Sequence, residues 1–374
     1  MAAGKLMVSV ALRMPYVFLP TLAVGLGTTI AHLGFLLGLA ELVGLGTFLI
    51  GRSIDRGAYR KWLLTGLATT ITGLALMALA GSAAVFALGF AGATLGVGLY
   101  TASAHSFIGS EVPYDRRGRV IGVLETTWAV AILLGAPTVG LVIAALGWQA
   151  PWGLISFGLL PISIWLFRSF PKHVGGPGPH HRRERLRLTR PIVLTLVSSF
   201  TASFGSIAIF STYGSWLEER FGLTAGTIGV LSVAIGGAEL VASTATVRFS
   251  DQWGKRRSAM GGIVLMATGA TAVMIVPKVT ALGIAALVVV FLGFEFGFIC
   301  LLSIASEVGG ENRGSVVSVN GALGTVARAS SAAIATTVFA GHGMPAAAAI
   351  SVLSAGVAAA ALAATAGTRR RSIA

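Results

Sequence analysis

Long apolar stretches separated by short polar loops run through almost the whole chain of 374 residues. Each stretch is about 20 residues long, the length that an α-helix needs to cross about 30 Å of hydrocarbon. The pattern therefore predicts an all-α membrane protein with twelve transmembrane helices. The predicted spans are 5–24, 32–51, 62–80, 83–107, 119–146, 150–168, 191–213, 226–247, 258–277, 280–304, 315–340 and 345–366.

The polar loops of the first half recur in the second half at an offset of about 196 residues. The matches are Asp55 with Asp251, Arg60 with Arg256, Lys61 with Arg257, Arg117 with Arg313, and Gly118 with Gly314. Many transporters are built from two related halves that surround one central site. We therefore expect two pseudo-symmetric six-helix bundles, 1–169 and 191–374, joined by a basic Gly/Pro-rich linker at 170–190.

The composition excludes an ordinary soluble domain, because only 11% of the residues are charged and the mean hydropathy is +0.85. The net charge of +14 could suit nucleic acid, but the position of the charges argues against that partner. Of the 27 Lys and Arg residues, 23 lie in or beside alternate loops or in the termini. The other four are Arg13, Arg220, Lys278 and Arg328. Short basic loops stay cytoplasmic. We expect a multi-pass protein of the cell (cytoplasmic) membrane with both termini inside, its basic loops anchored to lipids.

The sequence carries none of the common catalytic constellations. It has no His-x-x-x-His pair, no paired acidic metal motif and no Walker-type loop, and His180-His181 lacks further ligands at metal-binding spacing. The single cysteine, Cys300, lies in an apolar segment and cannot form an intramolecular disulfide. The first apolar stretch contains Arg13 and Pro15 and no small-residue cleavage site, so it is interpreted as the first transmembrane helix. We expect no enzyme, no metal and no cofactor.

Six charged residues lie inside the apolar spans: Arg13, Glu41, Glu125, Glu239, Glu295 and Arg328. Each costs about 2.5–3.5 kcal/mol at the bilayer centre, so each should face a partner or a watery cavity. Two arginines neutralise only two of the four glutamates, and burial disfavours the charged form of a carboxyl group, as a proton carrier requires. We place the substrate and proton pathway at these six residues, with Glu239 or Glu295 carrying protons. The alternative is a structural ion pair together with a hydrated glutamate.

Two loops and one span carry a family resemblance. Residues 51–61 read G-R-S-I-D-R-G-A-Y-R-K, and this segment resembles the signature G-x-L-x-D-R-x-G-R-R/K of the major facilitator superfamily. Residues 248–257 repeat its Asp and its basic end. In the fifth span, Gly135, Pro137 and Gly140 resemble the G-P-x-x-G-G export motif of the same family. The resemblance covers essentially the whole chain, although 83–104 lack the arginine common in the fourth helix of proton-coupled drug exporters.

The resemblance implies roles for residues in the loops and spans. Asp55 would latch the two halves together when the inner side is closed, supported by Arg56, Arg60 and Lys61. The alternative is that these four residues are loop charges that face the lipid headgroups. The expected gating residues are Asp55, Arg56, Arg60, Lys61, Arg117, Gly118, Asp251, Arg256, Arg313 and Gly314. In the family's fold Arg13 could pair with Glu125, and Arg328 with Glu295 or Glu41.

The expected function is secondary transport by alternating access, most simply proton-coupled efflux of small amphipathic or cationic compounds by a monomer. The Gly/Pro motif of the fifth span and the surplus of intramembrane acids favour export. An importer or facilitator of a sugar or organic anion is the alternative, since Arg13 and Arg328 would suit an anion.

Overall fold

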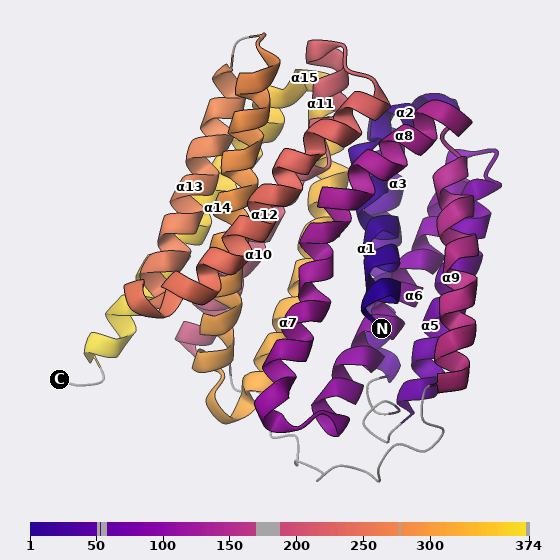
Figure 1. The fold of residues 1–374 in the computed structure, drawn as a ribbon. Coiled ribbons are helices and arrows are strands. Elements are labelled where there is room, and N and C mark those ends of the chain that lie inside the picture. The colour runs from indigo at the N-terminus through magenta and orange to yellow at the C-terminus, as the bar shows by residue number, and fades with distance from the viewer. Residues whose placement is uncertain (51–52, 54–57, 170–187, 277, 372–374) are drawn as a thin grey trace. The chain divides into compact units, whose positions relative to one another are not determined.

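The computed structural model describes the chain except for residues 51–52, 54–57, 170–187, 277 and 372–374 (Figure 1). The described part is almost entirely helical. In the first half the elements are α1 (Ala2–Val17), α2 (Leu19–Gly25), α3 (Ile30–Glu41), the 3₁₀ segment η1 (Leu42–Ile50), α5 (Tyr59–Ala78), α6 (Ala83–Glu111), α7 (Tyr114–Val130), the π-helical turn η2 (Ala131–Gly135), α8 (Ala136–Leu146) and α9 (Ala150–Ser169). In the second half they are α10 (Arg190–Phe210), α11 (Tyr213–Phe221), α12 (Ala225–Trp253), α13 (Lys255–Ile275), α14 (Thr280–Val308), the 3₁₀ turn η3 (Gly310–Asn312) and α15 (Arg313–Arg371).

The helices match the spans predicted from the apolar stretches. Within the described residues, ten helical segments are long and apolar enough to cross a membrane, or eleven if the bent pair α1 and α2 is one span. The last segment, Arg313–Thr365, is interrupted at Gly343 and accommodates the two spans predicted at 315–340 and 345–366. Every predicted span thus has a helical counterpart, and the all-α membrane class is confirmed.

Proline and glycine explain the two breaks. The axes of α1 and α2 differ by 75°, with Pro15 in the last turn of α1 and Pro20 in the first turn of α2. Proline cannot donate the backbone hydrogen bond that a continuous helix would need there. In α15, Gly343 has φ 72° and ψ −174°, a conformation that an L-residue with a side chain rarely adopts, and Pro345 follows it.

The described contacts divide the chain into two compact units. Unit 1 comprises Met1–Arg182 and Thr224–Val233, and unit 2 comprises Arg183–Leu223 and Ala234–Ala374. The first turns of α12 therefore group with the N-terminal helices. Most of the predicted linker 170–190 lies outside the described residues, so the predicted boundaries of the two halves stay a prediction.

Glycines allow two helix pairs to pack at backbone contact, α5 with α6 and α13 with α14. A Cβ atom on Gly66 would lie 2.6 Å from a backbone oxygen of α6, and one on Gly262 would lie 2.5 Å from a backbone nitrogen of α14. Gly73 and Gly269 meet backbone atoms of the same partners as closely. Gly66 and Gly262 are separated by 196 positions, as are Gly73 and Gly269, so the internal repeat extends from the loops into the helix packing. Such close approach is how transmembrane helices gain packing energy where water supplies no driving force.

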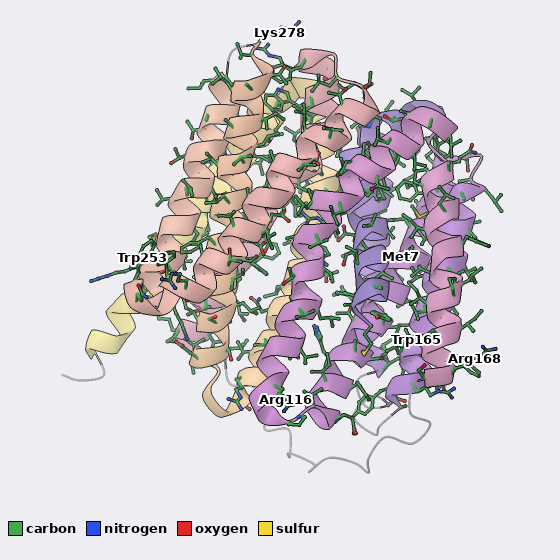
Figure 2. All side chains as sticks on the ribbon, in the orientation of Figure 1. Met7, Arg116, Trp165, Arg168, Trp253 and Lys278 are labelled. Carbon is green, nitrogen blue, oxygen red and sulfur yellow. The ribbon has the colours of Figure 1, made fainter. Side chains whose placement is uncertain are left out.

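Large apolar side chains remain exposed along the outer helices. On α9, Phe157 is 73% exposed and Trp165 is 59% exposed, and only 28% of this span is buried (Figure 2). Apolar surfaces of this kind are rare on soluble proteins, whereas lipid tails would cover them without cost.

Candidate functional site

Arg13 is held in unit 1 by the backbone and the ring of one tryptophan. It lies midway along the bent α1–α2 span and is only 5% exposed. Its Nη1 donates to the carbonyl oxygen of Trp128 on α7 at 2.9 Å, and its guanidinium carbon lies 4.8 Å from the centre of the Trp128 ring. A desolvated arginine over a tryptophan face is a favourable cation–π arrangement. These contacts attach α1 to the part of α7 that precedes the π-helical turn.

Glu41 is buried at the end of α3 and receives a hydrogen bond from Tyr16. The Tyr16 hydroxyl donates to Glu41 Oε1 at 2.9 Å, and both residues are less than one-tenth exposed. Hydrogen bonds to a charged acceptor in a low-dielectric surrounding are strong. The sequence places Glu41 inside an apolar span but does not indicate Tyr16 as its partner.

A polar cluster joins α1, α6 and α7 in unit 1. His105 Nε2 lies 2.9 Å from Glu125 Oε1, and Lys5 Nζ donates to Thr101 Oγ1 at 2.8 Å. Thr101 and His105 are one turn apart on α6, so both bonds belong to the same face of that helix. His105 is thus a partner of Glu125 that the sequence did not indicate, and the pairing of Glu125 with Arg13 stays a prediction. Lys5, which the sequence places with the N-terminus, is only 6% exposed.

In unit 2 the predicted proton carriers lie on α12 and α14 and share one serine. Ser243 Oγ is 3.1 Å from Glu295 Oε1 and 3.0 Å from the backbone oxygen of Glu239, which is one turn earlier on α12. Glu239 is 3% exposed and Glu295 is partly buried, and each stands near the midpoint of its helix. The Ser243 hydroxyl can therefore donate either to the carboxyl group of Glu295 or to the backbone carbonyl of Glu239.

Arg328 lies at mid-length of the part of α15 that precedes Gly343. Its Nη2 donates to Thr325 Oγ1, one turn earlier on the same helix, at 3.1 Å. The pairing of Arg328 with Glu295 or with Glu41 stays a prediction.

The Gly/Pro motif of the fifth span interrupts the regular α-helix, and its glycines allow neighbouring helices to approach closely. The π-helical turn Ala131–Gly135 comes directly before Pro137, which lies in the first turn of α8. A proline cannot continue the regular ladder of hydrogen bonds, and π turns are frequent at functional sites. A Cβ atom on Gly135 would lie 2.6 Å from Val10 Cγ2 of α1, and one on Gly140 would lie 2.6 Å from the carbonyl oxygen of Ala225, which belongs to unit 1. Both glycines are therefore positions of close helix approach.

The loop arginines Arg60 and Arg256 make repeat-related contacts inside their own units. Arg60 Nη2 donates to the carbonyl oxygen of Phe167, near the end of α9, at 2.6 Å. Arg256 Nη2 donates to the carbonyl oxygens of Leu362 and Ala363 at 2.8 and 2.6 Å. Ala363 follows Phe167 by 196 positions, the offset that also relates the two arginines. Phe167 lies in the last turn of α9, where carbonyl groups lack helical partners and a cation is favourable, whereas Leu362 and Ala363 lie about two turns before the end of α15.

The other predicted gating residues are placed only in part. Asp55 and Arg56 lie outside the described residues, as do the side chains of Arg117 and Asp251. Arg117 and Gly118 belong to α7 and Asp251 to α12. Lys61 lies 5.3 Å from the centre of the Trp62 ring. Arg313 and Gly314 are exposed in the first turn of α15. No group of three metal-ligating side chains occurs in the described part of the chain.

Together these features define a multi-pass helical membrane protein that is built from a repeated unit, with charged residues buried midway through its spans. The chain belongs to the Major Facilitator Superfamily, whose family model matches residues 1–332. The family predicted from the loop and fifth-span segments is thereby confirmed. Its members are membrane transporters and not enzymes, in agreement with the sequence prediction.

Two curated relatives show how far the likeness extends. An uncharacterized MFS-type transporter YwfA of Bacillus subtilis is 26% identical over 269 residues, which cover 69% of this chain and 63% of that protein. A chloramphenicol resistance protein of Streptomyces lividans is 26% identical over 253 residues, covering 66% of this chain and 62% of that protein. The match thus spans less than two thirds of the length of either relative.

The fold is also that of a solved transporter structure. A bacterial homologue of the human lysosomal transporter Spinster, in an inward-facing and unoccupied conformation, matches with a TM-score of 0.76. The match covers 96% of this chain and 95% of the other, at 12% sequence identity, and it shows a shared fold alone.

Proposed function

We propose that this protein is a secondary active transporter that works by alternating access and exports small amphipathic or cationic compounds in exchange for protons. It acts as a monomer in the cytoplasmic membrane with both termini on the cytoplasmic side. The positive-inside distribution of Lys and Arg supports this topology.

The observation that carries the proposal is the contact of the Ser243 hydroxyl with the Glu295 carboxyl group and with the backbone carbonyl of Glu239. Glu239 and Glu295 stand at mid-length of two apolar helices, where a permanent charge is costly. The Ser243 hydroxyl can donate to the ionised Glu295 and can turn to the Glu239 carbonyl when Glu295 is protonated. The site therefore supplies a hydrogen-bond partner for both protonation states of one carboxyl group. A proton carrier needs such a site, because neither state is then left without a hydrogen-bond partner.

The direction of transport rests on two further observations. The Gly135, Pro137 and Gly140 motif, with its π-helical turn, resembles the family's export motif. In addition, one relative is named as a chloramphenicol resistance protein. Both favour removal of a compound from the cytoplasm over uptake.

Accumulation of a fluorescent cationic dye in cells that lack their own exporters tests the proposal. We expect less dye in cells with the wild-type protein, and we expect a protonophore or Glu295→Gln to abolish the difference. The matched control is Glu219→Gln, which neutralises an exposed glutamate on α11 and should leave export unchanged. Ser243→Ala should preserve export and shift its pH dependence, because only the hydrogen bond to the carboxyl group is lost.

Equal dye levels in all cells, with the protein shown to be in the membrane, would refute export of cationic compounds. The second candidate is then an importer or facilitator of a sugar or organic anion. The buried guanidinium of Arg13 and the mid-span Arg328 favour that candidate, because each could bind an anionic or hydroxyl-rich substrate.

A further inference from the structure

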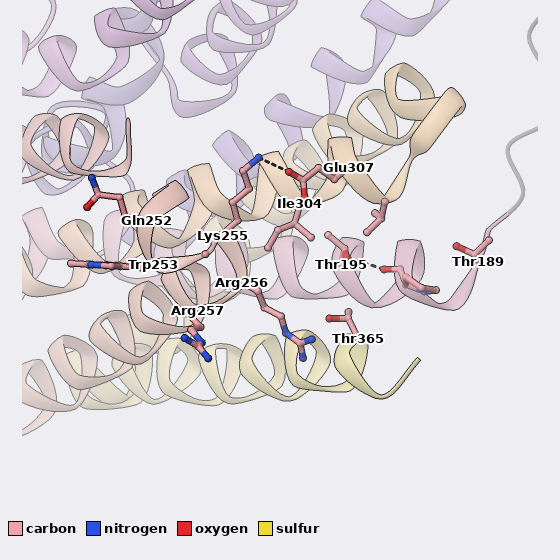
Figure 3. A pocket seen from close by; sticks show the side chains of 13 residues that line it. Thr189, Thr195, Gln252, Trp253, Lys255, Arg256, Arg257, Ile304, Glu307 and Thr365 are labelled. Carbon is pink, nitrogen blue, oxygen red and sulfur yellow. Dashed lines mark hydrogen bonds and ion pairs between the residues drawn. The ribbon is translucent and has the colours of Figure 1, made fainter. Parts of the chain in front are cut away.

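A basic pocket opens at one end of unit 2, away from the carboxyl groups of the proposed proton pathway. Its volume is about 810 Å³. Its walls come from the start of α10, the α12–α13 turn, the start of α13, the end of α14 and the late part of α15 (Figure 3). Four helices that contact one another in unit 2, α10, α13, α14 and α15, therefore surround it. This pocket is called the α13 pocket below.

Positive charge dominates the α13 pocket. Lys255, Arg256 and Arg257 line it against one lining carboxylate, that of Glu307. Lys255 pairs with Glu307 (Figure 3). Arg256 donates to carbonyl oxygens of α15. Arg257 is exposed and makes no hydrogen bond or ion pair to the rest of the described chain. Three cations thus face one carboxylate in the lining, so the pocket carries an excess of positive charge.

Two helices also begin at the α13 pocket. Thr189 and Gly254 are the N-cap residues of α10 and α13, and neither helix has a side-chain hydrogen bond at its cap. Each of these helices has 21 residues. The first backbone N–H groups of a helix lack partners within it and carry partial positive charge. A cavity lined by cations and by two such helix starts favours an anion with several acceptor oxygens.

The wall of the α13 pocket includes a side chain typical of the membrane interface. Trp253 is 56% exposed and stacks on Phe249, with ring centres 5.2 Å apart. Trp253 and Lys278 lie at opposite ends of α13 in Figure 2. Exposed tryptophans collect at the level of the lipid headgroups. The opening is therefore at the depth where lipid phosphates lie, on the cytoplasmic side in the proposed topology.

We propose that the α13 pocket binds a phosphate group, supplied by the headgroup of an anionic phospholipid or by a soluble phosphate ester. Arg257 and the start of α13 contact the phosphate oxygens, and Arg256 and the start of α10 add positive charge to the pocket. Glu307 opposes binding because its carboxylate holds Lys255 and repels the anion. The proposal uses the membrane placement but does not depend on the transported substrate or on the coupling ion.

The test is native mass spectrometry of the full chain purified in a neutral detergent and titrated with phosphatidylglycerol or phosphatidylcholine. We expect phosphatidylglycerol to bind more tightly than phosphatidylcholine. Arg257→Gln should weaken phosphatidylglycerol binding about 5- to 10-fold, from the usual contribution of one basic side chain near an anionic lipid. Glu307→Gln should tighten it a few-fold. Lys278→Gln removes a cation at the opposite end of α13 and should change nothing.

Competition with inorganic phosphate and glycerol 3-phosphate distinguishes the two sources. Displacement of the lipid at millimolar concentrations, lost in Arg257→Gln, would assign the pocket to a soluble phosphate ester. Lipid binding that resists both competitors would assign it to the headgroup. The proposal is overturned if phosphatidylglycerol and phosphatidylcholine bind equally, or if Arg257→Gln and Lys278→Gln have the same effect. Because no transport is measured, loss of dye export in the earlier experiment leaves this result unaffected.

Discussion

Replacing Gly262 with alanine tests whether backbone contact between α13 and α14 stabilises unit 2. A Cβ atom at this position would lie 2.5 Å from the backbone nitrogen and 2.6 Å from the Cα atom of Gly297. It would also lie 2.7 Å from the carbonyl oxygen of Gly293. All three atoms belong to the backbone, so no side-chain rotation relieves the overlap. Gly261, one position earlier on α13, is the matched control, because a Cβ atom there would meet no atom of another described helix within 4 Å.

The magnitude follows from comparing the two variants. To restore an ordinary contact of 3.4 Å, α13 and α14 would have to separate by about 0.9 Å. Overpacking of this kind typically costs about 1–3 kcal/mol. Each Gly→Ala change also gains up to about 1 kcal/mol of helix propensity. That gain is common to both variants and cancels, so Gly262→Ala should be about 1–3 kcal/mol less stable than Gly261→Ala.

Thermal unfolding of both variants in the same detergent measures this difference. For a unit of this size, about 2–4 °C of midpoint shift is expected for each kcal/mol. Gly261→Ala should unfold at or slightly above the wild-type temperature, and Gly262→Ala below it. Equal midpoints for the two variants would refute the reasoning, because they share composition, helix and propensity and differ only in the contact.

Two further predictions concern single contacts in unit 1. Tyr16→Phe removes the hydrogen bond to buried Glu41 and should lower stability by about 1–3 kcal/mol in thermal unfolding. Tyr59→Phe is the control, because the Tyr59 hydroxyl has no hydrogen bond among the described residues. An equal loss of stability in the two variants would contradict the prediction. Arg60→Lys removes the guanidinium group that donates to the Phe167 carbonyl, and it should lower the free energy of unfolding by about 0.5–1 kcal/mol because this contact is partly exposed. Arg168→Lys, at an exposed position, is the control. An equal change in unfolding temperature in the two variants would argue against an anchoring role for Arg60.

The fold could be predicted almost completely from the sequence because the lipid bilayer imposes one length scale. Apolar runs of about 20 residues must be helices, since lipid leaves no other way to satisfy the backbone. The break between α1 and α2 was harder to foresee. Pro15 and Pro20 stand inside one continuous apolar run, and hydropathy alone does not distinguish a straight span from a bent one.

The sequence predicts how far along its span each candidate site residue lies, but it does not predict which residues that side chain contacts. Counting along the spans places Glu295 near mid-depth and Glu239 slightly inward, and in the structure each residue stands near the midpoint of its helix. The contact of Glu295 with Ser243 depends on how α12 and α14 are rotated about their axes, which depth does not fix. His105 illustrates the same limit, because its bond to Glu125 joins two helices whose facing sides are set by packing. A usable signal was present for Lys5, which stands on the same side of α1 as the buried Val8 and Ser9.

The internal repeat indicates a structural role for the loop arginines that neither half of the chain would indicate alone. A single arginine bonded to a helix end could be an incidental surface contact of little energetic weight. Arg60 and Arg256, however, bond to carbonyl groups at Phe167 and Ala363, so both donor and acceptor recur at the same offset of 196 residues. The residues around these pairs differ, Lys255 standing where the first half has Tyr59. A contact that persists while its neighbours change is explained most directly by its function within each unit, which is to attach the start of one helix to the late part of another. Each unit then holds its own helices together through this contact, and the gating role implied for the loop residues stays a prediction, with Asp55 the first to test.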